Sequence, residues 1–308
     1  MDVQPILVTE GLTKRYGDRL AVDNVNLTIP RGVAFGYLGP NGAGKTTLIK
    51  MLLGLTKVTS GKMQIRGYEL PEHRQAALSR VGAIIEEPRF LPHLSGRENL
   101  EVFASVRGPH SFENIPSALE RVGLKDRCED KVAKYSLGMR QRLGIARCLL
   151  CDPELLILDE PMNGLDPAGI LEFRYLIRSL VDEGRTVVIS SHLLDEIEKT
   201  CDAVAIVDRG KVVRQGTIEE MTSNESGIIR AATNNSELAQ KVLISSGLVE
   251  GVSLDESDEL LITPSTGVKT SALTRVLVLA DIGVESIYQE KTTLEDEFLS
   301  ITQSGVEV

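Results

Sequence analysis

The chain has 308 residues, of which 42% are hydrophobic and 25% are charged, and this balance excludes a disordered, collagen-like or disulfide-scaffold protein. Its 34 basic and 44 acidic residues give a net charge of −10, which leaves no basic excess for binding nucleic-acid phosphates. Residues 225–308 alone carry 5 basic and 14 acidic side chains, and a loop-like run at 222–227 indicates a domain boundary there.

No segment is typical of secretion or membrane insertion. The start, MDVQPILVTE, lacks the basic residues and apolar stretch of a signal peptide. The longest uncharged run, residues 32–44, has about 13 residues, whereas about 20 are needed to span a bilayer. We therefore expect a chain that crosses no membrane by itself.

The first predicted elements are two mixed strands, near residues 6–16 and 24–29, followed by an apolar strand at 34–38. A glycine-rich segment then matches the pattern G-x-x-x-x-G-K-T, from Gly39 to Thr46, and a helix follows at 45–53. Glycines let backbone N–H groups curl around phosphate oxygens, and the helix N-terminus adds partial positive charge. The pattern predicts that Lys45 reaches the β- and γ-phosphates of a nucleotide and that Thr46 ligates Mg²⁺. The alternative, an ordinary glycine-rich turn, is disfavoured by the flanking strand and helix.

Residues 87–150 have a different pattern and predict a helical insert. After a short strand at 81–85, three helices are expected, at 97–106, 113–122 and 137–150. Cys148 and Cys151 form a CxxC motif at the end of this insert, but no second pair accompanies them. Reduced structural thiols are therefore favoured over a metal site, which suits the cytosol.

A second apolar strand, 155–159, ends in two acidic residues, Asp159 and Glu160. A strand buried on both faces would expose this end beside the phosphate loop. Asp159 is then predicted to hold the Mg²⁺ shell, and Glu160 to orient and deprotonate an attacking water. The alternative is that both acids simply end a strand in solvent.

The remaining α/β elements repeat the alternation of apolar strand and helix, which predicts a parallel sheet covered on both faces. In chain order they are a helix at 168–183, a strand at 186–191, a helix at 193–199, and strands at 203–208 and 211–216. Residues 223–308 then predict strand, helix, two strands, helix and strand, the βαββαβ order of a ferredoxin-like α+β domain, with a last helix at 293–302.

Several segments together carry a family resemblance. Residues 135–147 read YSLGMRQRLGIAR, followed by LLILDEP, by NGLD at 163–166 and by ISSH ending at His192. With the phosphate loop, in this order and spacing, they resemble the ATP-binding subunit of an ABC transporter over about residues 5–222. The resemblance implies a phosphate-loop NTPase core of ABC type with ATP and Mg²⁺ as cofactors. It also implies a homodimer in which two copies pack head to tail around two ATP molecules.

The resemblance also implies roles for individual residues. Ser136 and Gly138 would contact the γ-phosphate held by the opposite copy, and His192 would contact the γ-phosphate and the water beside Glu160. Asp166 would couple the two sites. Tyr16 would stack on adenine, and Thr47 would touch the α-phosphate. The full nucleotide-binding set implied is Tyr16, Gly39, Asn41, Gly42, Ala43, Gly44, Lys45, Thr46, Thr47, Ser136, Gly138 and Asp166.

Four of these assignments have a structural alternative. Tyr16 could be a half-buried packing aromatic, and His192 could simply begin a helix. Ser136 and Asp166 could cap the helices that follow them, with Pro167 in the first turn of the second; for Ser136 we expect both roles.

Two places depart from the usual family pattern. The signature reads S-L-G-M instead of S-G-G-Q, which affects details of the dimer contact. Glu86 stands where the family usually has glutamine, and we expect it to bind Mg²⁺ and to act at the catalytic centre. A shift of register would give this role to Glu87, and a solvated loop acid is the other alternative.

Glu86 and the YSLGM segment resemble one branch, the ATPases of bacitracin-type and lantibiotic-immunity exporters. Such a subunit would drive a separate membrane permease that removes peptide antibiotics, although drug and lipid exporters share these motifs. Loop 86–94 and the helical insert would dock the permease, which would place the chain on the cytoplasmic face of the membrane. A non-transport ABC ATPase acting on ribosomes or DNA is the main alternative, disfavoured by the single phosphate loop. A nucleotide-gated regulator without turnover is disfavoured by Glu160 and His192.

The acidic segment 223–308 has no predicted catalytic residues. Its ending, TTLEDEFLSIT, resembles one found in the same exporter branch. It could be an accessory domain that strengthens the dimer, or a regulatory, partner-binding module. Its charge would repel acidic lipid headgroups.

Overall fold

A computed structural model describes residues 4–222, 227–255, 257–289 and 293–303. The chain divides into two compact units, one of Met1–Ile218 with Phe298–Val308 and the other of Glu219–Glu297. Most of the predicted boundary loop, residues 223–226, lies outside the described residues.

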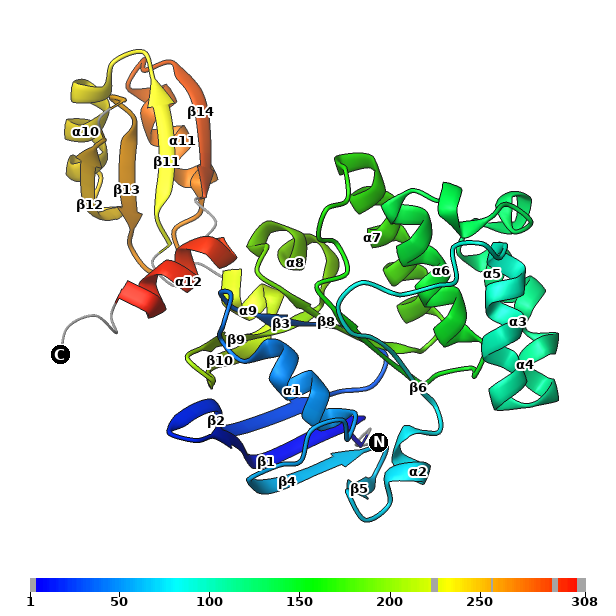
Figure 1. Cartoon of the computed structure of the whole chain (residues 1–308). Helices are drawn as coiled ribbons and strands as arrows, with labels where there is room; N and C mark the ends of the chain where they lie inside the picture. The colour runs from blue at the N-terminus through cyan, green and yellow to red at the C-terminus, as the bar shows by residue number, and fades with distance from the viewer. Residues whose placement is uncertain (1–3, 223–226, 256, 290–292, 304–308) are drawn as a thin grey trace. The chain divides into compact units, whose positions relative to one another are not determined.

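The centre of the first unit is a six-stranded sheet with the order β10-β9-β3-β8-β7-β6 (Figure 1). All of its neighbouring strands are parallel except β9 and β10. The bounds are β3 Ala34–Leu38, β6 Val81–Ile84, β7 Leu155–Asp159, β8 Thr186–Ser191, β9 Ala203–Asp208 and β10 Lys211–Thr217. Every residue of β3, β7 and β8 is buried, as their uninterrupted apolar runs predict.

Helices cover both faces of this sheet, and β3 shows how. Successive strand side chains point to opposite faces. Phe35 and Tyr37 pack in the same core as α1 (Lys45–Leu52). Gly36 faces α8 (Leu194–Thr200), where a Cβ would lie only 2.5 Å from a methyl carbon of Ile197. Close approach of α8 therefore requires glycine at position 36. Helix α7 (Pro167–Asp182) also packs on this sheet.

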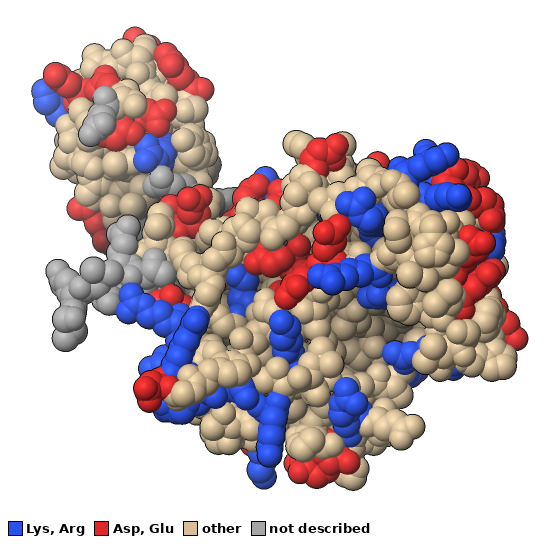
Figure 2. Space-filling view, in the orientation of Figure 1, with Lys and Arg blue, Asp and Glu red and all other residues tan. Residues whose placement is uncertain are grey.

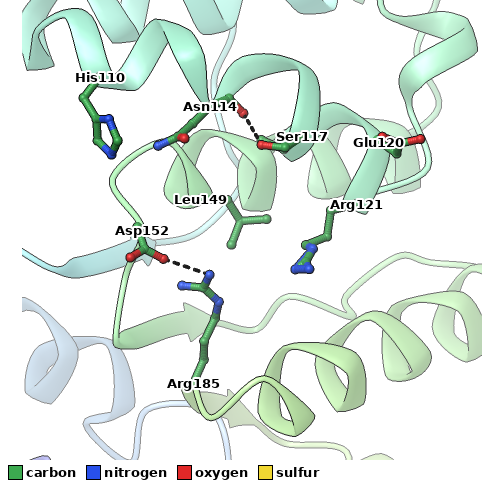
Figure 3. A pocket seen from close by; sticks show the side chains of 9 residues that line it. His110, Asn114, Ser117, Glu120, Arg121, Leu149, Asp152 and Arg185 are labelled. Carbon is green, nitrogen blue, oxygen red and sulfur yellow. Dashed lines mark hydrogen bonds and ion pairs between the residues drawn. The ribbon is translucent and has the colours of Figure 1, made fainter.

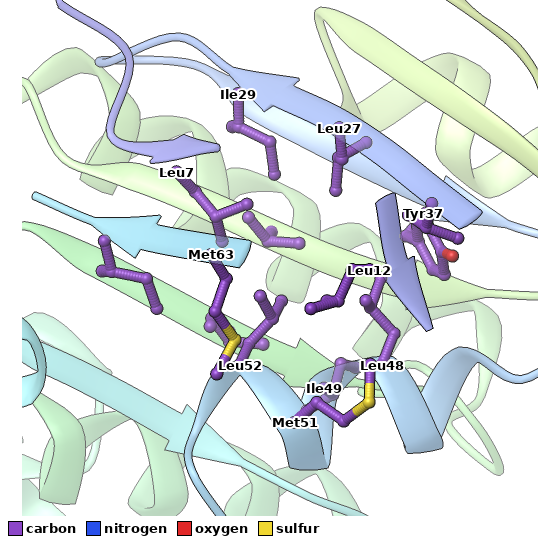
Figure 4. Packing of buried hydrophobic residues seen from close by; sticks show 14 of the residues in the cluster. Leu7, Leu12, Leu27, Ile29, Tyr37, Leu48, Ile49, Met51, Leu52 and Met63 are labelled. Atoms are coloured by element: carbon purple, nitrogen blue, oxygen red, sulfur yellow. The ribbon is translucent and has the colours of Figure 1, made fainter. Parts of the chain in front are cut away.

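An antiparallel sheet with the order β2-β1-β4-β5 packs on the other side of α1. Its strands are β1 Leu7–Tyr16, β2 Arg19–Ile29, β4 Ser60–Ile65 and β5 Tyr68–Leu70, and α2 (Arg74–Leu78) follows them. Figure 4 shows the shared core, in which Leu7, Leu12 and Met63 of the sheet meet Leu48 and Leu52 of the helix. Each such side chain contributes about 1.5–3 kcal/mol by leaving water, so α1 is held firmly below the phosphate loop.

The helical insert lies between β6 and β7, as predicted. It contains α3 Gly96–Arg107, α4 Pro109–Glu113, α5 Ile115–Arg121 and α6 Leu137–Leu149, with 3₁₀ turns at Lys125–Arg127 and Val132–Lys134. The start predicted for the second helix was wrong, because residues 109–113 form a helix of their own and α5 begins at Ile115. Pro116 explains the break, since proline lacks the N–H that would continue a helix from α4.

The second unit is a four-stranded sheet with the order β12-β13-β11-β14, in which all neighbouring strands are antiparallel. The elements are β11 Ile229–Thr233, α10 Ser236–Ser245, β12 Val249–Leu254, β13 Leu260–Pro264, α11 Thr270–Leu279 and β14 Val284–Gln289. This order confirms the predicted ferredoxin-like α+β fold. Its core is separate from that of the first unit and includes Ile229, Leu260 and Leu277.

Two short helices complete the chain, α9 (Ile218–Thr222) and α12 (Leu294–Gln303). In the part of the chain that the structure describes, no helix is long and apolar enough to cross a membrane. Figure 2 shows Lys and Arg side chains spread over the first unit, and several groups of Asp and Glu on the visible face of the second.

Candidate functional site

The predicted site residues gather where parallel strands end. The phosphate loop leaves β3, Glu160 follows β7 and His192 follows β8, so all three come from the carboxyl edge of one sheet. Within the loop, Gly44 has a φ of +98°, and a Cβ there would lie 2.1 Å from the carbonyl oxygen of Ala21. Only glycine fits this position, and its conformation turns the chain into α1.

Lys45 lies inside the loop that it follows. Its side chain is only 6% exposed. Its Nζ donates to the carbonyl oxygens of Gly39, at 2.6 Å, and Pro40, at 3.2 Å. The same Nζ lies 3.1 Å from a carboxylate oxygen of Glu160. A buried ammonium group at this point provides a fixed positive charge for phosphate oxygens.

Asp159 is the centre of a hydrogen-bond network beside Lys45. One carboxylate oxygen accepts from the Thr46 hydroxyl at 2.8 Å, and the other accepts from the Ser190 hydroxyl. Thr46 and Asp159 thus offer adjacent oxygen ligands, which is the chemistry that Mg²⁺ requires. Among the described residues, no group of three or more His, Cys, Asp and Glu side chains could hold a metal ion. The Thr46 hydroxyl and the Asp159 carboxylate are adjacent oxygen donors and fit a cation that takes its other ligands from nucleotide and water.

Glu160 joins Lys45 to His192. Its second carboxylate oxygen lies 2.9 Å from Nδ1 of His192. Its backbone has a φ of +49°, which is unusual for a residue other than glycine. The N–H of Glu160 is held by the carbonyl oxygen of Ser190 at 3.1 Å and by its hydroxyl at 3.0 Å. A residue kept in this conformation by its surroundings is typical of functional sites.

A pocket of about 420 Å³ opens above these groups. It is lined by Tyr16, Arg19, Ala21, Asn41, Gly42, Gly44, Lys45, Thr46, Thr47 and Glu160. Of the predicted loop residues, Gly39 and Ala43 do not line it; Ala43 is buried. The Tyr16 ring is 51% exposed, and the Lys14 ammonium lies 4.7 Å from its centre. An exposed aromatic ring on the rim of a phosphate pocket suits stacking on a base.

The sequence reasoning missed three residues of this site, namely Arg19, Ala21 and Ser190. Arg19 lines the pocket because it pairs with Tyr16 across the β1–β2 hairpin. Ser190 bonds both Asp159 and Glu160 from the neighbouring strand. A signal existed for Ser190, since it lies two residues before His192 in a strand predicted to reach the same edge.

The signature residues lie elsewhere. Ser136, Gly138 and Asp166 line a second pocket, which shares no residue with the first. The Ser136 side chain caps α6 by accepting from the N–H of Met139, and Asp166 caps α7 by accepting from the N–H of Gly169. Leu137, unusual in the signature, is accommodated because Gly164 opposite it has no side chain. The two pockets of one chain are therefore separate.

The two acidic residues of the loop after β6 have different partners. Glu86 is largely exposed, has a φ of +59° and lies 3.5 Å from Nζ of Lys50. Glu87 lies 3.2 Å from Nε of Arg140 on α6. Lys50 is four residues after Thr46 on α1, so its ammonium group is on the same helix face as the proposed metal ligand.

A further pocket lies between the helical insert and the core (Figure 3). Its charged side chains are paired: Arg185 lies 2.9 Å from Asp152, and Arg121 pairs with Glu183. Asn114 donates to the carbonyl oxygen of Leu150 at 3.0 Å. The Arg121–Glu183 pair joins the insert to the core.

Cys148, the first cysteine of the CxxC motif, is buried. All four cysteines of the chain are free, and burial raises the pKa of the Cys148 thiol to about 11. At neutral pH this thiol stays protonated and therefore unreactive.

Comparisons with known proteins agree with this geometry. The family model described as "ABC transporter" matches residues 22–163. The bacitracin transport ATP-binding protein BcrA of Bacillus licheniformis is 39% identical over 301 residues, which cover 97% of this chain and 98% of BcrA. The lantibiotic transport ATP-binding protein SrtF of Streptococcus pyogenes is 41% identical, over 71% of this chain and 97% of its own.

Among solved structures, a dimeric post-hydrolysis state of the ATP-binding cassette MJ0796, bound to ADP and phosphate, has a TM-score of 0.61 and 25% identity. The match covers 69% of this chain and 98% of that one.

Proposed function

Because this chain belongs to the ATP-binding proteins of ABC transporters, we propose that it is the ATP-hydrolysing subunit of an exporter whose permease is a separate chain. Family membership makes the chain an ATPase that binds ATP and ADP. The finer assignments that follow, namely residue roles, metal, permease and location, are part of the proposal.

The observation that carries the proposal is the position of Glu160. Its carboxylate lies within 3.1 Å of Lys45 Nζ and within 2.9 Å of His192 Nδ1, beside the phosphate loop. A carboxylate held between a phosphate-binding cation and an imidazole is placed to bind a water and to accept its proton. Ser190 fixes the strained backbone of Glu160, so this carboxylate is oriented before substrate arrives.

The remaining residues of the pocket would position the nucleotide. The loop N–H groups and Lys45 would hold the phosphates, and Tyr16 would stack on adenine. Thr46 and Asp159 would hold Mg²⁺, which when bound neutralises charge on the phosphate oxygens. We propose Glu86 as a further ligand that leaves Lys50 for this role, and His192 as a contact to the γ-phosphate.

The two separate pockets support a head-to-tail homodimer, in which each pocket would form half of a composite nucleotide site. Ser136 and Gly138 begin a 13-residue helix, whose N-terminus favours an anion, yet they are not part of the pocket that holds Lys45. A second copy would bring its own Ser136 and Gly138 to the nucleotide of the first. Asp166 lies in the same pocket as Ser136 and would couple the sites.

The proposal for the permease and the transported substrate is based on the names of the relatives. BcrA and SrtF are named for the transport of bacitracin and of a lantibiotic, so we propose export of a peptide antibiotic or a related amphipathic molecule. The insert would dock the permease and hold the chain at the cytoplasmic face of the membrane. Val106 on α3 is 85% exposed, which suits an apolar contact. The acidic second unit is proposed as an accessory or regulatory domain.

The test is affinity capture of the chain from detergent-solubilised membranes of its native cells, followed by mass spectrometry. We expect a small multi-span permease in the eluate, and we expect Val106→Asp to lose it. The control is Leu55→Asp, which places the same charge at a residue that is 60% exposed and lies outside the insert. Capture of ribosomal or DNA-bound proteins alone would instead favour the non-transport ABC ATPase.

A further inference from the structure

Arg140 links two segments that the proposed function assigns to different nucleotides. Its Nε donates to the Glu87 carboxylate at 3.2 Å, and its Nη1 donates to the carbonyl oxygen of Tyr135 at 2.8 Å. Glu87 directly follows Glu86, whose carboxylate lies 3.5 Å from Nζ of Lys50 on α1, the helix that follows the phosphate loop. Tyr135 directly precedes Ser136, which would face the nucleotide of a second copy. The Arg140 side chain therefore bridges the loop that contains Glu87 and the segment that precedes Ser136.

Packing below Arg140 joins the same two segments. Gly144, one turn further along α6, lies so close to the loop that a Cβ there would be 3.0 Å from Pro88 and 2.9 Å from Ile84. A displacement of Pro88 is therefore transmitted to α6 by direct contact.

Helix α6 also carries a buried hydrogen-bond acceptor that has no partner in the described part of the chain, and such a group favours rearrangement. Gln141, next to Arg140, is only 4% exposed, and its Oε1 has no hydrogen-bond partner among the described residues. A buried acceptor without a partner is costly, so an arrangement of loop and helix that satisfies it would be favoured.

We propose that Arg140 is a positioning residue that couples occupancy of the phosphate-loop site to the presentation of Ser136 to a second copy. This inference rests on the proposed function. When Glu86 moves toward bound nucleotide, Glu87 moves with it and Arg140 carries the shift to the backbone before Ser136. By reciprocity, contact of Ser136 with the partner's nucleotide tightens nucleotide binding in the chain's own pocket.

The Arg140–Glu87 ion pair should contribute little to the free energy of unfolding, so its removal tests the proposal without unfolding the chain. The Arg140 and Glu87 side chains are 33% and 58% exposed, and ion pairs at such exposure have small effects on stability. Removing Arg140 should therefore leave the melting temperature and the ATP affinity of the monomer unchanged, while weakening ATP-driven dimerisation.

The experiment uses the Glu160→Gln chain, in which ATP should persist in the dimer. The ATP concentration for half-maximal dimerisation is measured by analytical ultracentrifugation, and monomer affinity by a fluorescent ATP analogue at low protein concentration. We expect Arg140→Ala to raise the half-maximal concentration about tenfold. Glu87→Ala should raise it too, and the double variant should be no worse than Arg140→Ala, because the two residues act as one unit. Arg140→Lys keeps a donor and a charge and should recover part of the loss.

The matched control is Lys125→Ala, which removes the exposed Lys125–Glu120 pair, 2.9 Å, from the same insert. An unchanged half-maximal concentration in Arg140→Ala, with normal dimerisation of Glu160→Gln, overturns this inference and leaves the proposed function intact. Equal losses in Arg140→Ala and Lys125→Ala also overturn it. Failure of Glu160→Gln itself to dimerise contradicts the proposed function, and this inference with it.

Discussion

Lys45 carries a nearly buried charge in the site. Its ammonium group is surrounded by two loop carbonyl oxygens and by the Glu160 carboxylate, and almost no solvent reaches it. Hydrogen bonds of this charged kind are about twice as strong as neutral ones, and burial increases their strength further. The same contacts keep Lys45 in place before phosphate oxygens arrive, so little entropy is lost when nucleotide binds.

Replacing this lysine tests that view. Lys45→Ala should weaken ATP binding by about ten- to a hundredfold, since a hydrogen bond to a charged group contributes about 1.5–3 kcal/mol. Isothermal titration calorimetry measures the affinity. Lys62→Ala, an exposed lysine on β4, serves as control and should bind normally. Equal affinity of the Lys45 variant and the wild type would remove Lys45 from the phosphate site.

At the scale of elements, the sequence predicted the central sheet well because its strands are apolar without interruption. The same reasoning found no signal for β4, β5 and α2. In β4 only Met63 and Ile65 are buried, and β5 and α2 have three and five residues, which is too short to establish a period. These elements are stabilised by tertiary packing, because their apolar side chains belong to the hydrophobic core around α1.

The site residues also fall into those that the sequence predicted and those that depend on tertiary contacts. The phosphate loop, Asp159 and Glu160 were found from local pattern and from the edge that parallel strands share, whereas His192 was found from the family resemblance. Arg19 enters the pocket only through pairing with Tyr16 across a hairpin, and no local pattern encodes that contact. For Glu86, the partner in the structure is Lys50, a contact between residues 36 positions apart. Its predicted role at the metal therefore remains a prediction.

Close packing of α8 on β3 gives a second test. Gly36→Val would place a Cβ atom 2.5 Å from a methyl carbon of Ile197, so α8 must shift. We expect a loss of about 1–3 kcal/mol in the free energy of unfolding, measured by denaturant titration. The same change at Gly251, where nothing lies within 4 Å, should have little effect and serves as control. Full stability of the Gly36 variant would contradict the close packing.

At the scale of the whole molecule, the two units differ in net charge and have separate hydrophobic cores. Residues 225–308 carry 5 basic and 14 acidic side chains, and their hydrophobic core is separate. All residues that line the phosphate pocket precede Ile218. The SrtF relative aligns over 97% of its own length with only 71% of this chain.

The second unit should therefore be dispensable for nucleotide binding. Replacing residues 227–289 with a flexible Gly–Ser linker should keep ATP affinity within about threefold, because no described pocket residue is lost. Calorimetry measures the affinity, and circular dichroism confirms that the shortened chain is folded. A folded but non-binding chain would show that the second unit takes part in the site.

The central claim is that Glu160 completes ATP hydrolysis between two copies of the chain. The most direct test is the mass of Glu160→Gln in solution with Mg²⁺ and ATP, measured by light scattering alongside its ATP turnover. The account predicts a particle of twice 33.6 kDa that requires ATP, with turnover reduced about a hundredfold or more. Glu113→Gln, an exposed glutamate on α4, should behave as the wild type. A monomeric Glu160→Gln chain that still hydrolyses ATP at the normal rate would contradict the account.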